Sequence, residues 1–219
     1  MTDKEYYELI RINPSGKNQS ERNAEEAARF GLTIPQYKKM VAAFKMLYEN
    51  CIRYPLCWKD LEGRRPISRN FYESCGTLNG GMFKSSDALL LEAKNKLLKQ
   101  QGREDEIQEK TTKDHIRNPQ MYFYYLAEFA EKFNTLELFF PQWKMCSTTI
   151  TVTQSENDAL SECSSKEGKV LVTLDKRYEL CVSQLWSKET GQVIDKFPYE
   201  FDEDHLKWEM ENQLIIDAK

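Results

Sequence analysis

Apolar residues spaced three and four positions apart predict several helices in the first half of the chain. The first covers residues 2–12 and stops at an Asn-Pro-Ser-Gly sequence. A second helix begins near Ser20, which can cap it, and Gly31 ends it by supplying a left-handed residue. The same spacing over residues 86–101 predicts a further helix.

The strongest helix start signal lies just after Gly31. Thr33 is followed three residues later by Gln36, which is a capping box, and Pro35 stands in the first turn, where its missing N–H costs nothing. The apolar positions of this long amphipathic helix continue until Pro55 stops it. Residues 55–85 hold Pro, Gly and Asn at close intervals and predict loops around short elements.

The second half of the chain mixes helical and strand patterns. An apolar stripe predicts a helix packed into the core of a second domain; it runs through Tyr122, Leu126, Phe129 and Phe133. Three segments rich in β-branched residues then predict strands, with a hairpin between the last two at the Asp-Lys-Arg of 175–177; the segments cover residues 147–154, 169–175 and 178–186.

A last strand is expected near Val193 and Ile194, after a turn at Lys-Glu-Thr-Gly-Gln. An acidic amphipathic helix over 202–216, which Asp202 can cap, closes the sequence. We therefore expect an α+β protein whose second domain holds a small antiparallel sheet, a meander, and a C-terminal helix.

The predicted domains follow one another along the chain. Residues 1–103 form a basic helical domain with a helix-turn-helix-like segment at about 20–52, residues 104–115 a charged linker, and residues 116–219 an acidic α+β domain. Residues 1–103 hold 18 Lys and Arg against 12 Asp and Glu, and the remainder holds 13 against 23. Such an asymmetry indicates that the first half meets an anionic partner or that the halves attract one another.

Composition narrows the class of protein. With 40% apolar and 30% charged residues, the chain has the composition of a folded globular protein. No apolar run approaches the roughly 20 residues of a membrane span, and the N-terminal residues lack the pattern of a secretory signal. We expect an intracellular protein, cytoplasmic or nuclear, without a membrane partner, whose six cysteines are reduced.

Residues 27–41 resemble a helix-turn-helix. A small residue, Ala27, lets two helices cross closely, Gly31 allows the tight turn, and Tyr37, Met40 and Val41 would lock the second helix at a fixed angle. On the outer face, Gln can read adenine edges and Lys can contact phosphate, and three later arginines can add backbone contacts. The predicted nucleic-acid-binding residues are Gln36, Lys38, Lys39, Lys45, Arg64, Arg65 and Arg69.

Plain helical packing with a solvated lysine face satisfies the same pattern. Any two-helix hairpin with a glycine turn fits much of it, and the second helix is about twice the usual length of a recognition helix. Both interpretations stay open at this level.

The other candidate catalytic motifs lack the residue spacing that their chemistry needs. Asp87, Glu92 and Lys94 match the acidic pair and lysine of many metal-dependent nucleases, but they fall on a predicted helix, where solvated charges account for them. His115 and His205 each stand beside an aspartate in a polar run, without a nucleophile motif. We therefore expect no catalytic, metal or cofactor site.

The sequence favours a non-catalytic regulatory or accessory protein that binds DNA or RNA through its basic helical half. Its α+β half would dimerise or bind another protein. One alternative is a protein-interaction factor, an inhibitor or an accessory subunit, without direct nucleic-acid contact. A second alternative is a metal-dependent nuclease.

Overall fold

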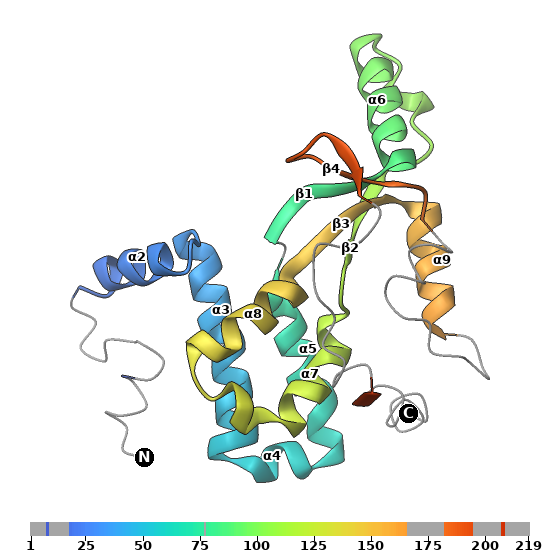
Figure 1. Cartoon of the computed structure of the whole chain (residues 1–219). Coiled ribbons are helices and arrows are strands. Elements are labelled where there is room, and N and C mark those ends of the chain that lie inside the picture. The colour runs from blue at the N-terminus through green and yellow to red at the C-terminus, as the bar shows by residue number, and fades with distance from the viewer. Residues whose placement is uncertain (1–7, 9–17, 77, 166–181, 195–206, 209–219) are drawn as a thin grey trace. The chain divides into compact units, whose positions relative to one another are not determined.

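A computed structural model gives the structure of this chain (Figure 1). It describes residues 8, 18–76, 78–165, 182–194 and 207–208. The expected helix at 2–12, the strand at 169–175, the hairpin at 175–177 and the helix at 202–216 fall outside these residues, apart from residues 8 and 207–208. The chain combines helices with a five-stranded sheet, which confirms the α+β class.

Two compact units are present, and each is built from two segments of the chain. Unit 1 comprises Met1–Leu78 and Arg117–Ser147, and unit 2 comprises Asn79–Ile116 and Thr148–Lys219. This division differs from the sequential one expected from the sequence, because the charged segment 104–115 lies inside unit 2. The helices of 117–147 pack within unit 1 rather than in a second domain.

Unit 1 is helical. Its elements are α2 (Gln19–Arg29), α3 (Ile34–Leu47), η1 (Tyr48–Arg53, a π-helix), α4 (Pro55–Lys59), α5 (Leu61–Cys75), α7 (Pro119–Glu128), η3 (Ala130–Phe133) and α8 (Leu136–Ser147). In Figure 1, α3, α5, α7 and α8 lie side by side as a bundle.

Local signals set the ends of α2 and α3. Gly31 adopts φ 64° after α2, as predicted, and the Thr33–Gln36 capping box is present at the start of α3. Ser20 is not the cap of α2, however, because the helix already begins at Gln19 and the cap residue is Asn18. The helical run that starts with α3 ends at Arg53, two residues before Pro55.

The core of unit 1 surrounds α3. Six residues of this helix are buried, and its Phe44 ring lies 5.5 Å from the Phe139 ring of α8. Phe71 of α5 lies 4.6 Å from Phe123 of α7, and the α8 side chain Trp143 is fully buried. These aromatic contacts tie the second chain segment of unit 1 to the first.

The prediction of loops over residues 55–85 is wrong, since α4, α5 and strand β1 (Leu78–Ser85) occupy this stretch. Asp60 starts α5 by accepting a hydrogen bond from the Glu62 amide at 3.1 Å. Gly63 lets this first turn approach the Cys57 carbonyl oxygen, which would lie 3.1 Å from an added Cβ. Pro66 then lies inside α5, where the packing of the bundle outweighs the lost hydrogen bond.

Unit 2 is built around the sheet. Its strand order is β2-β3-β1-β4-β5, from β1, β2 (Thr111–His115), β3 (Thr148–Thr153), β4 (Leu185–Ser187) and β5 (Gln192–Ile194). The helices of this unit are α6 (Ser86–Gln100), η2 (Glu104–Glu106) and α9 (Gln154–Ser165).

The sheet is not the antiparallel meander that the sequence predicted. It is mixed, although β1/β4, β2/β3 and β4/β5 pair antiparallel. Its central strand β1 was expected to be a loop, and β2 comes from the expected linker 104–115. The strand expected at 147–154 is confirmed as β3, and the one near Val193 as β5.

A buried carboxylate joins three elements of unit 2. Glu156, on the first turn of α9, accepts hydrogen bonds from the Ser85 hydroxyl (2.6 Å), the Thr153 amide (2.8 Å), and the Ser183 amide (2.9 Å) and hydroxyl (2.8 Å). The two hydroxyls in turn accept from the first-turn amides of α6, those of Ala88 and Asp87. Glu156 thus fixes where α6 leaves the sheet.

Candidate nucleic-acid interface

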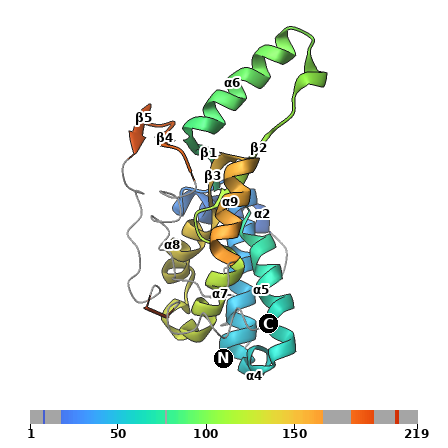
Figure 2. The same cartoon turned by 90° about the vertical axis from the view of Figure 1, so that its right-hand side faces the viewer.

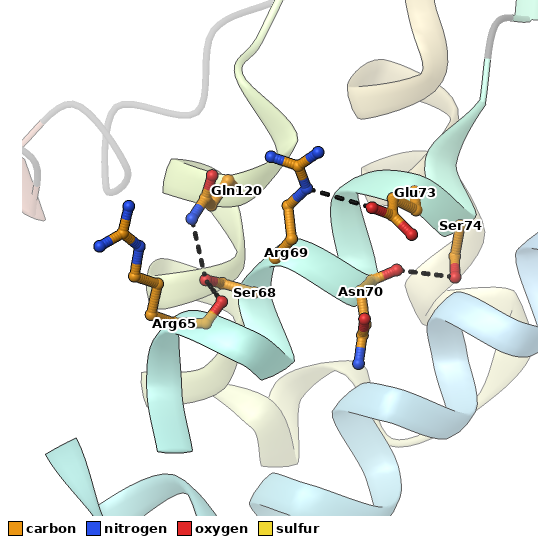
Figure 3. Close-up of polar contacts among 7 residues, drawn as sticks. All are labelled: Arg65, Ser68, Arg69, Asn70, Glu73, Ser74 and Gln120. Carbon is orange, nitrogen blue, oxygen red and sulfur yellow. Dashed lines mark hydrogen bonds and ion pairs between the residues drawn. The ribbon is translucent and has the colours of Figure 1, made fainter. Parts of the chain in front are cut away.

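Helix α5 carries three of the predicted nucleic-acid-binding residues, and its inner face holds it against the bundle. Phe71 and Cys75 are buried there, together with Ser68. The Ser68 hydroxyl donates to the Arg65 carbonyl at 3.0 Å and accepts from the Gln120 amide of α7 at 3.4 Å (Figure 3). Because this face is fixed, the opposite face of α5 is held toward solvent.

Two arginines stand one helical turn apart on this outer face. Figure 3 shows Arg65 and Arg69 pointing to the same side of α5. Among the described residues, the Arg65 side chain has no hydrogen-bond or ion-pair partner, and it is exposed. Arg69 donates from Nε to Glu73 at 3.1 Å, and the side chains of this pair are 64% and 61% exposed. An exposed pair of this kind contributes about 0.3–0.5 kcal/mol, so a phosphate can replace the carboxylate.

A tyrosine continues the same stripe. Tyr72 follows Arg65 by seven residues, or two turns, and the Arg69 guanidinium lies 5.8 Å from its ring centroid. Tyr72 is 38% exposed. Arg65, Arg69 and Tyr72 form what we call the α5 stripe.

Further arginines lie over aromatic rings near the start of α5. Arg64 donates from Nε to the Trp58 carbonyl at 2.8 Å, and its guanidinium lies 5.3 Å from the Trp58 ring centroid. Arg53 lies at the same distance from the ring of Tyr54, which is 53% exposed. Such stacking orients a guanidinium and leaves its edge for hydrogen bonds.

The four predicted residues of α3 have different surroundings. The Gln36 side-chain oxygen accepts hydrogen bonds from the Thr33 backbone amide and hydroxyl, both at 2.9 Å. This side chain is therefore part of the N-terminal cap of α3. Lys38 is exposed and Lys45 is half-buried. Lys39 lies over the end of α5, where its Nζ would be 2.6 Å from a Cβ at Gly76. A cation at that place interacts favourably with the helix dipole.

The helix-turn-helix-like segment forms two helices joined at Gly31, but α3 is not a projecting helix. It packs against α5, α7 and α8, and only its Lys38 and Lys39 edge is exposed beyond the first turn. The arrangement brings Lys39 of α3 beside the C-terminal end of α5. It makes α5, rather than α3, the helix with an open basic face.

The two units differ in net charge. Unit 1 holds 16 Lys and Arg against 13 Asp and Glu, and unit 2 holds 15 against 22. The basic surplus is therefore on the unit that carries the α5 stripe.

The acidic residues that matched a metal-dependent nuclease do not form a metal-binding cluster in the described ranges. No cluster of three or more His, Cys, Asp or Glu able to hold a metal ion occurs in them. Glu92 pairs with Lys84 at 2.5 Å. Burial, and secondarily the neighbouring Cys57, raises the pKa of the Cys51 thiol to about 12, which keeps this thiol protonated.

No protein-family model, curated protein or solved structure matches this chain. In the parts that the structure describes, no helix is long and apolar enough to cross a membrane. The aromatic members of the surface, Tyr54, Trp58 and Tyr72, were not expected from the sequence. Arg53 beside Tyr54, and Arg69 three residues before Tyr72, were the available signals.

Proposed function

We propose that this protein binds nucleic acid through the α5 stripe of unit 1 and acts as a non-catalytic regulatory or accessory factor. The observation that carries the proposal is the pair Arg65 and Arg69, one turn apart on a face of α5 that the bundle leaves open, with Arg69 stacked on Tyr72. Arginine suits phosphate because its planar group can donate two parallel hydrogen bonds.

The aromatic content favours an unpaired strand over a duplex. Exposed bases stack on aromatic rings and on guanidinium planes, whereas bases in a duplex stack on each other. Tyr72 and Tyr54 offer partly exposed rings, each with an arginine beside it. Recognition by a helix inserted in the major groove has less support, because α3 is packed into the bundle.

A titration of the full chain against single-stranded and duplex DNA and RNA of one sequence, at about 50 and 200 mM salt, tests the proposal. We expect binding to the single strands at low salt that weakens steeply at high salt, since phosphate contacts release counterions. Absence of binding to every probe at low salt refutes the proposal.

The role of stacking is tested with Tyr72→Ala. Loss of one stacked base costs about 1–3 kcal/mol, so single-strand affinity falls by about 5- to 160-fold while the salt dependence stays the same. Leu138→Ala, which removes an exposed apolar side chain elsewhere on unit 1, is the matched control and leaves affinity unchanged. Equal affinities of the two variants would exclude stacking on Tyr72.

A further inference from the structure

Helix α6 of unit 2 carries a row of solvent-exposed apolar side chains. Leu90 is 70% exposed and Leu97 is 53% exposed, although α6 begins at the sheet and has Ala88 and Leu98 buried on its other side. Within unit 2, α6 extends away from the strands (Figure 2). A helix that stands in solvent is ordinarily polar around its whole exposed surface, so exposed leucines need an explanation.

The exposed leucines form one stripe. Leu90 and Leu97 are seven residues apart, two helical turns, and the exposed Ala93 lies between them at the third position. This spacing of three and four is the one by which two helices pack against each other. We call Leu90, Ala93 and Leu97 the α6 stripe.

Exposed lysines flank the middle of the α6 stripe, and an exposed carboxylate, Asp87, lies three residues before Leu90 in the first turn of α6. Lys94 and Lys96 are exposed, lie on its two sides, and make no ion pair with a described residue. At these flanking positions of a helix pair, opposite charges select the partner and like charges repel it. A second copy of α6 crossing at Ala93 would bring lysine toward lysine, whereas an acidic helix would complement them.

We propose that the α6 stripe is a docking site for an amphipathic helix of a partner protein, with apolar residues along one face and acidic residues beside them. The leucines of the partner helix would bury Leu90 and Leu97, and the carboxylates of the partner helix would lie next to Lys94 and Lys96. This site is on unit 2 and does not depend on nucleic-acid binding by unit 1.

The test uses the full chain and two synthetic helical peptides of about three heptads, both with leucine at the core positions. One peptide has glutamate at the flanking positions and the other has lysine. We expect the glutamate peptide to bind in fluorescence anisotropy and the lysine peptide to bind at least tenfold more weakly. Absence of binding, or equal binding of both peptides, overturns the proposal.

Substitutions locate the site. The double variant Leu90→Ser/Leu97→Ser should lose at least tenfold in affinity for the glutamate peptide, and circular dichroism should show an unchanged fold because both side chains are exposed. Leu56→Ser/Leu138→Ser makes the same change at exposed leucines of unit 1 and should bind as the wild type does. Equal effects of both double variants overturn the assignment to α6.

Sedimentation of the free protein separates the proposed occupant from a second copy. The proposal expects a monomer at the concentrations of the peptide titration. Self-association that Leu90→Ser/Leu97→Ser abolishes would show that another copy of this chain covers the stripe, and would overturn the proposal.

Discussion

Replacing Glu156 with Gln should destabilise unit 2 more than any other single charge removal on α9. The four hydrogen bonds to this carboxylate fall in two pairs, one on each oxygen. An amide has one oxygen, so Gln can accept only one pair and leaves two donors without their acceptor. At about 1.5 kcal/mol for each hydrogen bond to a charged group, the expected loss is about 3 kcal/mol.

The pH dependence follows from the same geometry. Burial raises the pKa of Glu156, but hydrogen bonds from Ser85, Thr153 and Ser183 outweigh it, and the net pKa lies below the ordinary 4.5. A depressed folded-state pKa gives stability that is fully present above the unfolded-state pKa and is lost as pH falls through the folded-state pKa. The gap between wild type and Glu156→Gln should stay constant from about pH 5 to 7 and shrink below about pH 4.5.

Urea unfolding followed by circular dichroism, with hydrogen exchange of the residues 148–165 peptides, measures the effect on unit 2. Asp158→Asn is the control, because it makes the same charge change on an exposed side chain of the same helix. Equal losses of stability in the two variants would refute the assigned role of Glu156.

Three further predictions concern unit 1. Gly76→Ala should lose about 1–3 kcal/mol in urea unfolding, because φ 66° and ψ −156° is a backbone region open essentially only to glycine and the new Cβ would meet Lys39; unchanged stability would contradict this strain. Thr33→Ala should lose about 1 kcal/mol through the cap of α3, and a thermal melt unchanged within error would exclude that contribution. Burial, then a hydrogen bond with the neighbouring buried thiol, raises the pKa of Cys75 well above its ordinary value, so peptide mapping after a thiol reagent at about pH 8 should find exposed Cys57 modified and Cys75 untouched. Equal labelling of both cysteines would contradict it.

Short-range signals in the sequence predicted the elements that depend on short-range contacts. The Thr33 capping box, the turn at Gly31 and the helix over residues 86–101 involve neighbours within one or two turns, and all three are present. The strand at 147–154 could be predicted because all residues of β3 are β-branched. The structure buries all of them.

The elements that the sequence did not predict depend on distant partners. Strand β1 contains two adjacent glycines, which disfavour a strand, and its place at the centre of the sheet comes from pairing with segments far along the chain. Helix α5 contains Pro66 and forms because α3 and α7 cover its inner face. The stripe through Tyr122 predicted a helix correctly but could not identify the helices against which it packs.

The candidate interface was predicted in part. Arg64, Arg65 and Arg69 were named as supporting contacts from their charge alone, and the structure places them on one helix. The aromatic neighbour of Arg64 could not be predicted in the same way. Trp58 lies in α4 and Arg64 in α5, so their contact depends on how the two helices are joined. The sequence also placed the main contact on α3, since periodicity does not show which helix the bundle covers.

The salt dependence of single-strand binding tests the central proposal most directly. Each phosphate contact adds about −0.7 to the slope of log K against log salt concentration on a single strand. The double variant Arg65→Gln/Arg69→Gln should therefore bind with a slope that is shallower by about 1.4. Lys132→Gln/Lys144→Gln, which removes the same charge from exposed positions elsewhere on unit 1, should keep the wild-type slope. Identical slopes for the two double variants would contradict a phosphate-binding α5 stripe.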